Sequence, residues 1–391
     1  MPKRLLLTFV LLVFTFAVAA QDTQLRDDHP DRYVVQKGDT LWDISARFLK
    51  SPWLWPEVWY ANPQIENPHL IYPGDVISLT YVDGKPRLAV ERGRETVKLS
   101  PRIRTEPHRE AIDTIPLDAV RPFLQEMRIV NPGDRDKLAY VVAQPNERLI
   151  AGEGDEIYVR RLDAKPGDAV IIGREGQVFR QIDSDPPRTE AERWELGGGN
   201  TISRNVHEAG SNIWNAVAFW KDDSEVLGYE VIYEAEGQVV AAGDPATVHV
   251  TGSRREITPG DVVLPGINQT YNSHFEPRPA PADVHARVIA LAEGFYGAGQ
   301  YQVVALDKGS ADGLQPGHTF AVHEPGRRVR DNVMHPAGDL DTTFQPGKAK
   351  VDLPDREIGH LMVFRTFDHI SYALVMEAQD VVRPNYYAVA P

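Results

Sequence analysis

The sequence predicts a multidomain protein in which a small β-α-α-β domain at residues 31–80 is followed by mainly-β domains, built as small barrels or sandwiches. Its 391 residues are enough for two or three domains, each with its own core. Between residues 33 and 79 the apolar spacing changes from strand-like to helical and back again. Beyond residue 126, short β-branched runs alternate with turns that contain Gly and Pro, which is typical of all-β domains.

Residues 1–20 have the pattern of a secretory signal peptide. Lys3-Arg4 precedes an apolar run, Leu5–Val18, and small residues occupy Ala17–Ala20, where signal peptidase cuts. A membrane-spanning helix is the rival interpretation, but the run is shorter than the roughly 20 residues that a bilayer requires. Cleavage after residue 19 or 20 would release a chain with no membrane span.

The small domain is predicted to begin with a strand at Tyr33–Val35, which ends at a turn in Lys37-Gly38-Asp39 because Gly readily adopts positive φ. Asp39 or Thr40 can then cap a helix. Apolar residues recur at helical spacing over two segments: Leu41, Ile44, Ala46 and Phe48, then Trp55, Val58 and Trp59. A second turn, Pro73-Gly74-Asp75, leads into a closing strand at residues 76–79.

This stretch resembles the LysM domain. The resemblance rests on Tyr33, Val35, Gly38, Asp39, Thr40, Leu41, Ile44, Ala61-Asn62-Pro63, Asn67-Pro68, Ile71, Tyr72, Pro73 and Gly74. It implies binding of glycans that contain N-acetylglucosamine, peptidoglycan or chitin, in a shallow groove between the loop after the first strand and the loop before the last. Carried over to this sequence, the groove residues are Gly38, Asp39, Thr40 and Leu41, which face Asn67, Pro68, Leu70 and Ile71. The aromatic segment at residues 51–60 exceeds the LysM pattern.

The rest of the chain divides into three predicted parts. Residues 81–125 form a basic, Pro-containing linker, residues 126–280 a mainly-β middle domain, and residues 281–391 a mainly-β C-terminal domain. Turn signals separate the strands of the middle domain, among them Pro132-Gly133-Asp134, Pro166-Gly167-Asp168 and Pro259-Gly260-Asp261. An insertion at residues 181–225 interrupts this domain and ends in apolar residues at helical spacing: Ile213, Val217 and Trp220.

The order of these parts resembles the family of type IV pilus secretin-associated proteins of Gram-negative bacteria. The residues that carry this resemblance are KLSPRIR at 98–104, TIPLDAVRPFL at 114–124 and GSADGLQPGHTF at 309–320. The C-terminal part is similar to the C-terminal domain of the flagellar assembly protein T. The resemblance implies a periplasmic protein that anchors the outer-membrane pilus secretin to peptidoglycan.

The sequence offers little support for an enzyme. The net charge of −14 argues against a nucleic-acid partner, and the absence of cysteine excludes disulfides and cysteine nucleophiles. His335 and Asp339 match half of a zinc endopeptidase motif, but the chain has no HxH, and zinc catalysis requires three protein ligands. No HExxH or GxSxG is present. We therefore expect no catalytic residues, no metal ligands and no cofactor, although a glycosidase carboxylate pair stays open.

Three functions are compatible with these observations. The predicted function is a non-enzymatic periplasmic adaptor whose partners are peptidoglycan and an outer-membrane secretin. The second is a cell-wall hydrolase or an activator of one. The third is an accessory protein of a flagellar or polysaccharide-export system that uses the same modules.

Overall fold

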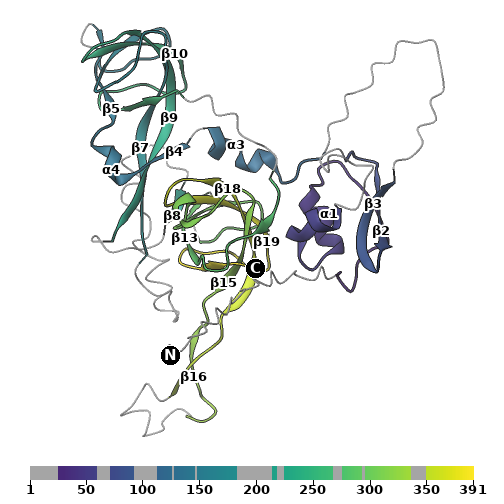
Figure 1. The fold of residues 1–391 in the computed structure, drawn as a ribbon. Coiled ribbons are helices and arrows are strands. Elements are labelled where there is room, and N and C mark those ends of the chain that lie inside the picture. Colours follow the sequence, from purple (N-terminus) through teal and green to yellow (C-terminus); the bar gives the residue numbers. More distant parts are fainter. Residues whose placement is uncertain are drawn as a thin grey trace, which may run out of the picture.

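The computed structural model describes residues 25–59, 71–91, 112–125, 127–145, 148–182, 214–217, 224–266, 275–292, 296–335 and 349–391 (Figure 1). Within these ranges the chain forms an N-terminal α+β domain, a middle β-barrel and a C-terminal β-barrel. No helix in the described ranges is both long and apolar enough to span a membrane. The signal peptide predicted at residues 1–20 lies outside them.

The N-terminal domain packs its helices against a small antiparallel sheet of order β1-β2-β3. Its elements are β1 (Arg32–Val34), α1 (Leu41–Phe48), the 3₁₀ turn η1 (Pro52–Leu54), α2 (Trp55–Trp59), β2 (Val76–Val82) and β3 (Lys85–Glu91). Its core contains Val35, Leu41, Ile44, Phe48, Leu49, Trp55, Val58, Trp59, Ile71, Ile77, Leu88 and Ile112. The predicted β-α-α-β order is confirmed, with β3 as an addition.

The third strand falls in the range predicted as a linker. β2 and β3 are joined by Asp83-Gly84, whose φ angles of 50° and 76° are both positive, as a tight two-residue hairpin turn requires. The other end of the same range is also regular, because helix α3 (Leu117–Gln125) forms there. Residues 92–111, between them, lie outside the described residues.

The middle barrel is a closed ring of six strands. The ring runs β10-β6-β5-β11-β7-β9 and closes where β9 pairs again with β10. Its strands are β5 (Ala139–Ala143), β6 (Glu156–Arg160), β7 (Ala169–Arg180), β9 (Val226–Ala241), β10 (Ala246–Ser253) and β11 (Val262–Pro265), while β4 (Met127–Val130) pairs with β9 outside the ring. Because inward-facing side chains alternate along each strand, the ring encloses one aliphatic core, which includes Val141, Val159, Ile172 and Val248.

Gly-Asp turns at five places share one hydrogen-bond pattern. In each, the Gly has a φ between 89° and 98°, and the Asp carboxylate accepts from the backbone N–H three residues earlier, at 2.7 to 3.1 Å. The turns contain Gly38-Asp39, Gly74-Asp75, Gly154-Asp155, Gly167-Asp168 and Gly260-Asp261. The predicted turn at Pro132-Gly133-Asp134 is wrong, because Pro occupies the first position of a short helix there, α4 (Pro132–Arg135).

The C-terminal barrel is a second closed ring of six strands. The ring runs β15-β18-β19-β14-β13-β20 and closes where β20 pairs with β15. Its strands are β13 (Ala286–Ala292), β14 (Val303–Leu306), β15 (His318–Glu324), β18 (Arg356–Thr366), β19 (Ser371–Ala378) and β20 (Tyr387–Val389). The short strand β12 (Arg278–Pro279) adds to β15, and η4 (Ser310–Asp312) follows β14. The two barrels confirm the predicted mainly-β body.

Two further β segments are attached to this barrel: strand β8 and the hairpin of β16 and β17. β8 (Trp214–Val217) is a strand that pairs with β13. The helix that the apolar spacing suggested at the end of the insertion is therefore wrong for these residues. Trp214 is buried in a sheet, where packing decides the conformation of a four-residue segment more than spacing does. β16 (Arg328–Arg330) and β17 (Lys350–Asp352) form a separate hairpin that projects from the barrel (Figure 1).

One hydrophobic cluster joins all three parts of the chain, and we call it the junction cluster. It combines N-terminal Trp42, Trp53 and Leu54 with Val120 and Phe123 of α3, Phe179 and Leu227 of the middle barrel, Trp214 of β8, and Met362, Phe364, Tyr372 and Leu374 of the C-terminal barrel. Trp53 stacks near His360 with ring centroids 4.3 Å apart. Trp53, in the aromatic segment that exceeds the LysM pattern, therefore contacts the C-terminal barrel.

Candidate glycan-binding site

The first wall of the predicted groove is the loop between β1 and α1. Gly38 is exposed and has a φ of 96°, which favours Gly at this position. The Asp39 carboxylate accepts from the Tyr33 hydroxyl and from the Gln36 N–H, both at 2.8 Å. Burial raises the pKa of Tyr33, and the hydrogen bond to Asp39 adds to this rise. The Asp39 carboxylate therefore already has a structural role, as the carboxylates of the other four Gly-Asp turns do.

Thr40 and Leu41 are built into the fold at the start of α1. The Thr40 hydroxyl accepts from the Asp43 N–H at 3.1 Å, and the Asp43 carboxylate accepts from the Thr40 N–H at 3.2 Å, so the pair forms a capping box. Thr40 and Leu41 are 4% and 1% exposed as whole residues, so little of their backbone or side chains is accessible in this structure.

The second wall is described only at its end. Asn67, Pro68 and Leu70 lie outside the described residues, while Ile71 is fully buried in the core of the N-terminal domain. The Ile71 backbone carbonyl accepts from the Ile112 N–H at 2.8 Å. The assignment of these eight residues to a groove stays a prediction.

A segment that sequence reasoning placed in the linker connects the two walls. The Leu41 N–H donates to the Asp113 carbonyl at 3.0 Å, and the Trp42 N–H donates to the Thr114 carbonyl at 3.4 Å. Ile112, whose N–H binds the second wall, is 7% exposed. The available sequence signal was the recurrence of Ile at 112 and 115 in an otherwise polar stretch.

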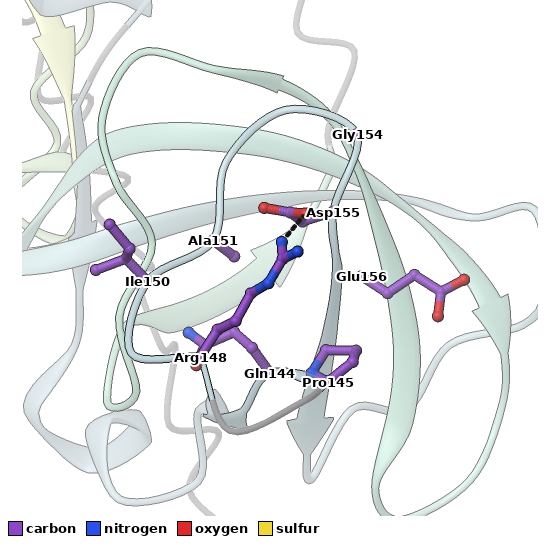
Figure 2. A pocket seen from close by; sticks show the side chains of 8 residues that line it. All are labelled: Gln144, Pro145, Arg148, Ile150, Ala151, Gly154, Asp155 and Glu156. Carbon is purple, nitrogen blue, oxygen red and sulfur yellow. Dashed lines mark hydrogen bonds and ion pairs between the residues drawn. The ribbon is translucent and has the colours of Figure 1, made fainter.

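A small pocket lies at the rim of the middle barrel (Figure 2). Its volume is about 190 Å³, and it is lined by Gln144, Pro145, Arg148, Ile150, Ala151, Gly154, Asp155 and Glu156. The Arg148 guanidinium is paired with Asp155 at 2.9 Å. Since Asp155 belongs to one of the Gly-Asp turns, this pair contributes to the shape of the barrel rim.

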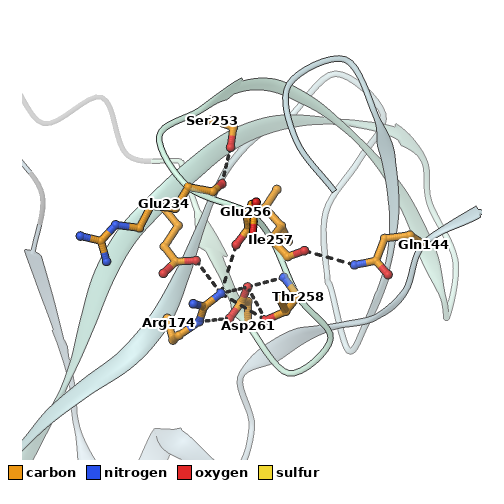
Figure 3. A network of polar contacts seen from close by, with 9 residues as sticks. Gln144, Arg174, Glu234, Ser253, Glu256, Ile257, Thr258 and Asp261 are labelled. Carbon is orange, nitrogen blue, oxygen red and sulfur yellow. Dashed lines mark hydrogen bonds and ion pairs between the residues drawn. The ribbon is translucent and has the colours of Figure 1, made fainter. Parts of the chain in front are cut away.

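A network of charged residues also lies in the middle barrel (Figure 3). Arg174 of β7 donates to both carboxylate oxygens of Asp261, at 2.8 and 3.0 Å, and lies 2.9 Å from a carboxylate oxygen of Glu234 of β9. Burial raises the pKa of Glu234 to about 7, against the lowering effect of Arg174. The network fixes the turn before β11 to two neighbouring strands, which is a structural role.

A second buried carboxylate, Glu230 of β9, lies where the two barrels meet. It accepts from the Trp214 indole N–H at 2.8 Å and from the Gln177 N–H at 3.2 Å. Burial raises its pKa to about 7. His335 is described, but Asp339 of the half motif lies outside the described residues. Within the described ranges, no three His, Asp or Glu side chains are grouped to hold a metal ion.

Comparison with known families assigns the N-terminal domain. The LysM domain family matches residues 33–80, a range that holds α1, α2 and most of β1 and β2 together with both predicted walls of the groove. The chain therefore contains a LysM domain, a module that binds glycans such as peptidoglycan. No curated protein matches the chain.

Proposed function

From the LysM domain at residues 33–80, we propose that this chain is a non-enzymatic periplasmic adaptor that binds peptidoglycan and anchors an outer-membrane type IV pilus secretin. The LysM domain is the observation that carries the glycan-binding half, because this module binds rather than cleaves. The periplasmic location follows from the signal-peptide pattern at residues 1–20. The secretin partner follows from the family resemblance of residues 98–104, 114–124 and 309–320.

The chemistry of the groove favours recognition through the backbone. An acetamido group carries one N–H donor and one carbonyl acceptor, so it needs one protein acceptor and one protein donor. The Leu41 N–H belongs to the first turn of α1, whose N–H groups have no acceptor within the helix. The Ile71 carbonyl belongs to the facing wall. Both groups are bonded to residues 113 and 112 in this structure, so a glycan that uses them would have to replace those bonds.

The barrels supply a body to which the LysM domain is fixed. The junction cluster buries Trp42 and Trp53 together with residues of both barrels. A single shallow groove binds glycan only in the roughly millimolar to micromolar range. Several copies on a ring-shaped secretin would bind together, and avidity could then exceed the single-site affinity by about 10² to 10⁴. With such avidity, one LysM domain per chain would be enough to hold the assembly on peptidoglycan.

The full-length mature protein is expected to sediment with insoluble peptidoglycan and to release no soluble muropeptides from it. Cellulose is the matched control, because its glucose units lack the acetamido group that the groove is proposed to read. The measurement is the bound fraction in each pellet, with chromatography of the supernatant. Equal binding to both polymers would contradict acetamido recognition, and muropeptide release that His335→Ala abolishes would favour the hydrolase alternative.

The tagged protein is expected to recover an outer-membrane secretin from detergent-solubilised envelopes of its own cells. The expected partner is a ring-forming protein, since the proposed avidity requires many copies. Mass spectrometry of the eluate identifies the partner, and eluate from untagged cells is the control. Recovery of flagellar or polysaccharide-export components in place of a secretin would favour the third function.

A further inference from the structure

Glu230 lies on a part of β9 that extends beyond the pairing of β9 with β10 in the middle barrel. That pairing covers Ala235–Ala241 of β9, whereas Glu230 lies opposite Ile129 of β4. Two residues before Glu230, a Cβ atom at Gly228 would come within 3.2 Å of the side chain of Ile370, which lies between β18 and β19. This end of β9 therefore packs against the C-terminal barrel.

The Glu230 carboxylate connects the two barrels through its hydrogen bonds. One oxygen accepts from the Trp214 indole N–H at 2.8 Å, and the other accepts from the Gln177 backbone N–H at 3.2 Å. Gln177 belongs to β7 of the middle barrel, whereas Trp214 belongs to β8, which pairs with β13 of the C-terminal barrel. The carboxylate is thus a polar contact between the barrels.

Apolar side chains and backbone surround this contact closely. Glu230 and Trp214 are both 0% exposed. The Trp214 ring centroid lies 5.2 Å from that of Tyr372 in β19 and 5.4 Å from that of Phe179 in β7. A Cβ atom at Gly176 would come within 2.8 Å of a Glu230 carboxylate oxygen, so β7 approaches the carboxylate through its backbone. Water can therefore reach the carboxylate only if the barrels move apart.

The charged side chains on the two flanking strands lie on the other face of the sheet. Arg128 of β4 and Glu175 of β7 each pair with Val231, the residue after Glu230. Because successive side chains of a strand point to opposite faces, neither of them faces Glu230. Glu175 is paired with Arg135 at 2.8 Å. The charges of β4 and β7 therefore do not balance a charge on Glu230.

The C-terminal barrel contributes Tyr372 of β19 and Arg365 of β18 to the same region. Burial and the nearby charge of Glu230 raise the pKa of Tyr372, against the lowering effect of Arg365. The Arg365 guanidinium donates to the carbonyls of Phe123 and Leu124 at the end of α3. Both hydrogen-bond donors to Glu230 are neutral, and burial raises its pKa to about 7. Loss of its proton would place a negative charge without a cationic hydrogen-bond partner between the barrels.

We propose that Glu230 is a pH-sensitive switch in the contact between the two barrels, which its protonated carboxyl keeps closed and its ionised carboxylate opens. In the open contact the carboxyl would be hydrated, and its pKa would return to the ordinary value of 4.5. Proton release therefore favours opening between about pH 4.5 and 7, and a further rise in pH adds nothing. This inference does not depend on the proposed glycan binding.

Hydrogen exchange of the full-length parent chain, followed by NMR from pH 5 to 8.5, tests the switch without a variant. After correction for the intrinsic pH dependence of exchange, protection of the Trp214 indole N–H and the Gln177 amide should fall by up to about a hundredfold and level off above about pH 7.5. The amides of Val141 and Val375, which bond within the middle and the C-terminal barrel, should keep their protection. Constant protection of Trp214, or an equal fall at all four groups, would overturn the switch, because the contact would then stay closed or a barrel would unfold.

Two glutamate variants show whether Glu230 is the group that responds. Glu230→Gln cannot ionise, so protection of the Trp214 indole N–H should be the same at every pH. Glu234→Gln is the matched control, because Glu234 also lies on β9 and burial raises its pKa to about 7, but its partner Arg174 is in the middle barrel. This variant should keep the pH response of the parent. A folded Glu230→Gln chain that responds as the parent does would contradict the assignment to Glu230.

Discussion

Replacing Trp42 with alanine is expected to lower the free energy of unfolding by about 3 to 5 kcal/mol, because truncation of a fully buried aromatic side chain leaves a cavity. Trp42 is 1% exposed and belongs to the junction cluster, not to the core of the LysM domain. The loss should therefore appear at the contact between that domain and the C-terminal barrel. Urea unfolding measures the size of the loss, and hydrogen exchange at β18 and β19 locates it.

Trp55→Ala is the matched control for this prediction. Trp55 is also 1% exposed, but it packs in the core of the LysM domain. We expect a loss of similar size with faster exchange in α1 and β2, and little change in β18 and β19. If both variants perturb the same strands to the same extent, the LysM domain and the C-terminal barrel unfold as one unit, and the two cores are not separable.

Local chemistry made part of this structure predictable. Each of the five Gly-Asp turns is held within four residues, because Gly supplies the positive φ and the Asp carboxylate binds an N–H three positions earlier. The turns at Gly38, Gly74, Gly167 and Gly260 were therefore predicted from the sequence. The helix start at Thr40 is local for the same reason, since the capping box spans only residues 40–43.

The features that were not predicted from the sequence depend on contacts between residues that are far apart in the chain. The closure of each barrel depends on a pairing between strands that are far apart in the chain, β6 with β10 and β15 with β20, and no local pattern specifies that pairing. Strand β8 forms because Trp214 enters the junction cluster, which overrides a helical spacing of only three residues. The contact of residues 112–114 with the LysM domain was not predicted, because the hydrogen bond between Ile112 and Ile71 joins residues that are far apart in the sequence.

The candidate site was predictable from the sequence only in part. The LysM resemblance predicts a groove between two loops, and the structure describes the first loop and the end of the second. It did not show that Asp39 and Thr40 use their side chains to hold the fold. A sequence motif indicates which residues line a site. Whether such a residue contacts a ligand through its backbone or its side chain depends on its neighbours in space. For this reason, the binding groups we propose are backbone groups of Leu41 and Ile71.

The difference in stability between Glu230→Gln and the parent is expected to change with pH by up to about 3 kcal/mol, always in favour of the variant as pH rises. Burial raises the pKa of Glu230 to about 7 in the folded chain, from 4.5 for a solvated glutamic acid. Below about pH 4.5 the carboxyl is protonated in both states and adds no pH dependence. Between 4.5 and 7 only the unfolded chain ionises, so the parent loses stability through this window, and above 7 the loss is complete.

Urea unfolding of the parent and the Glu230→Gln variant at pH 5, 6, 7 and 8 checks this prediction. Tyr372 of β19 is the titratable neighbour, and burial holds its pKa well above the range tested, so it should not contribute. Glu236→Gln is the matched control, because Glu236 lies on the same strand β9 but is exposed, and its difference from the parent should stay constant. A constant difference for Glu230→Gln as well would mean that the hydrogen bonds from Trp214 and Gln177 keep Glu230 ionised in the core.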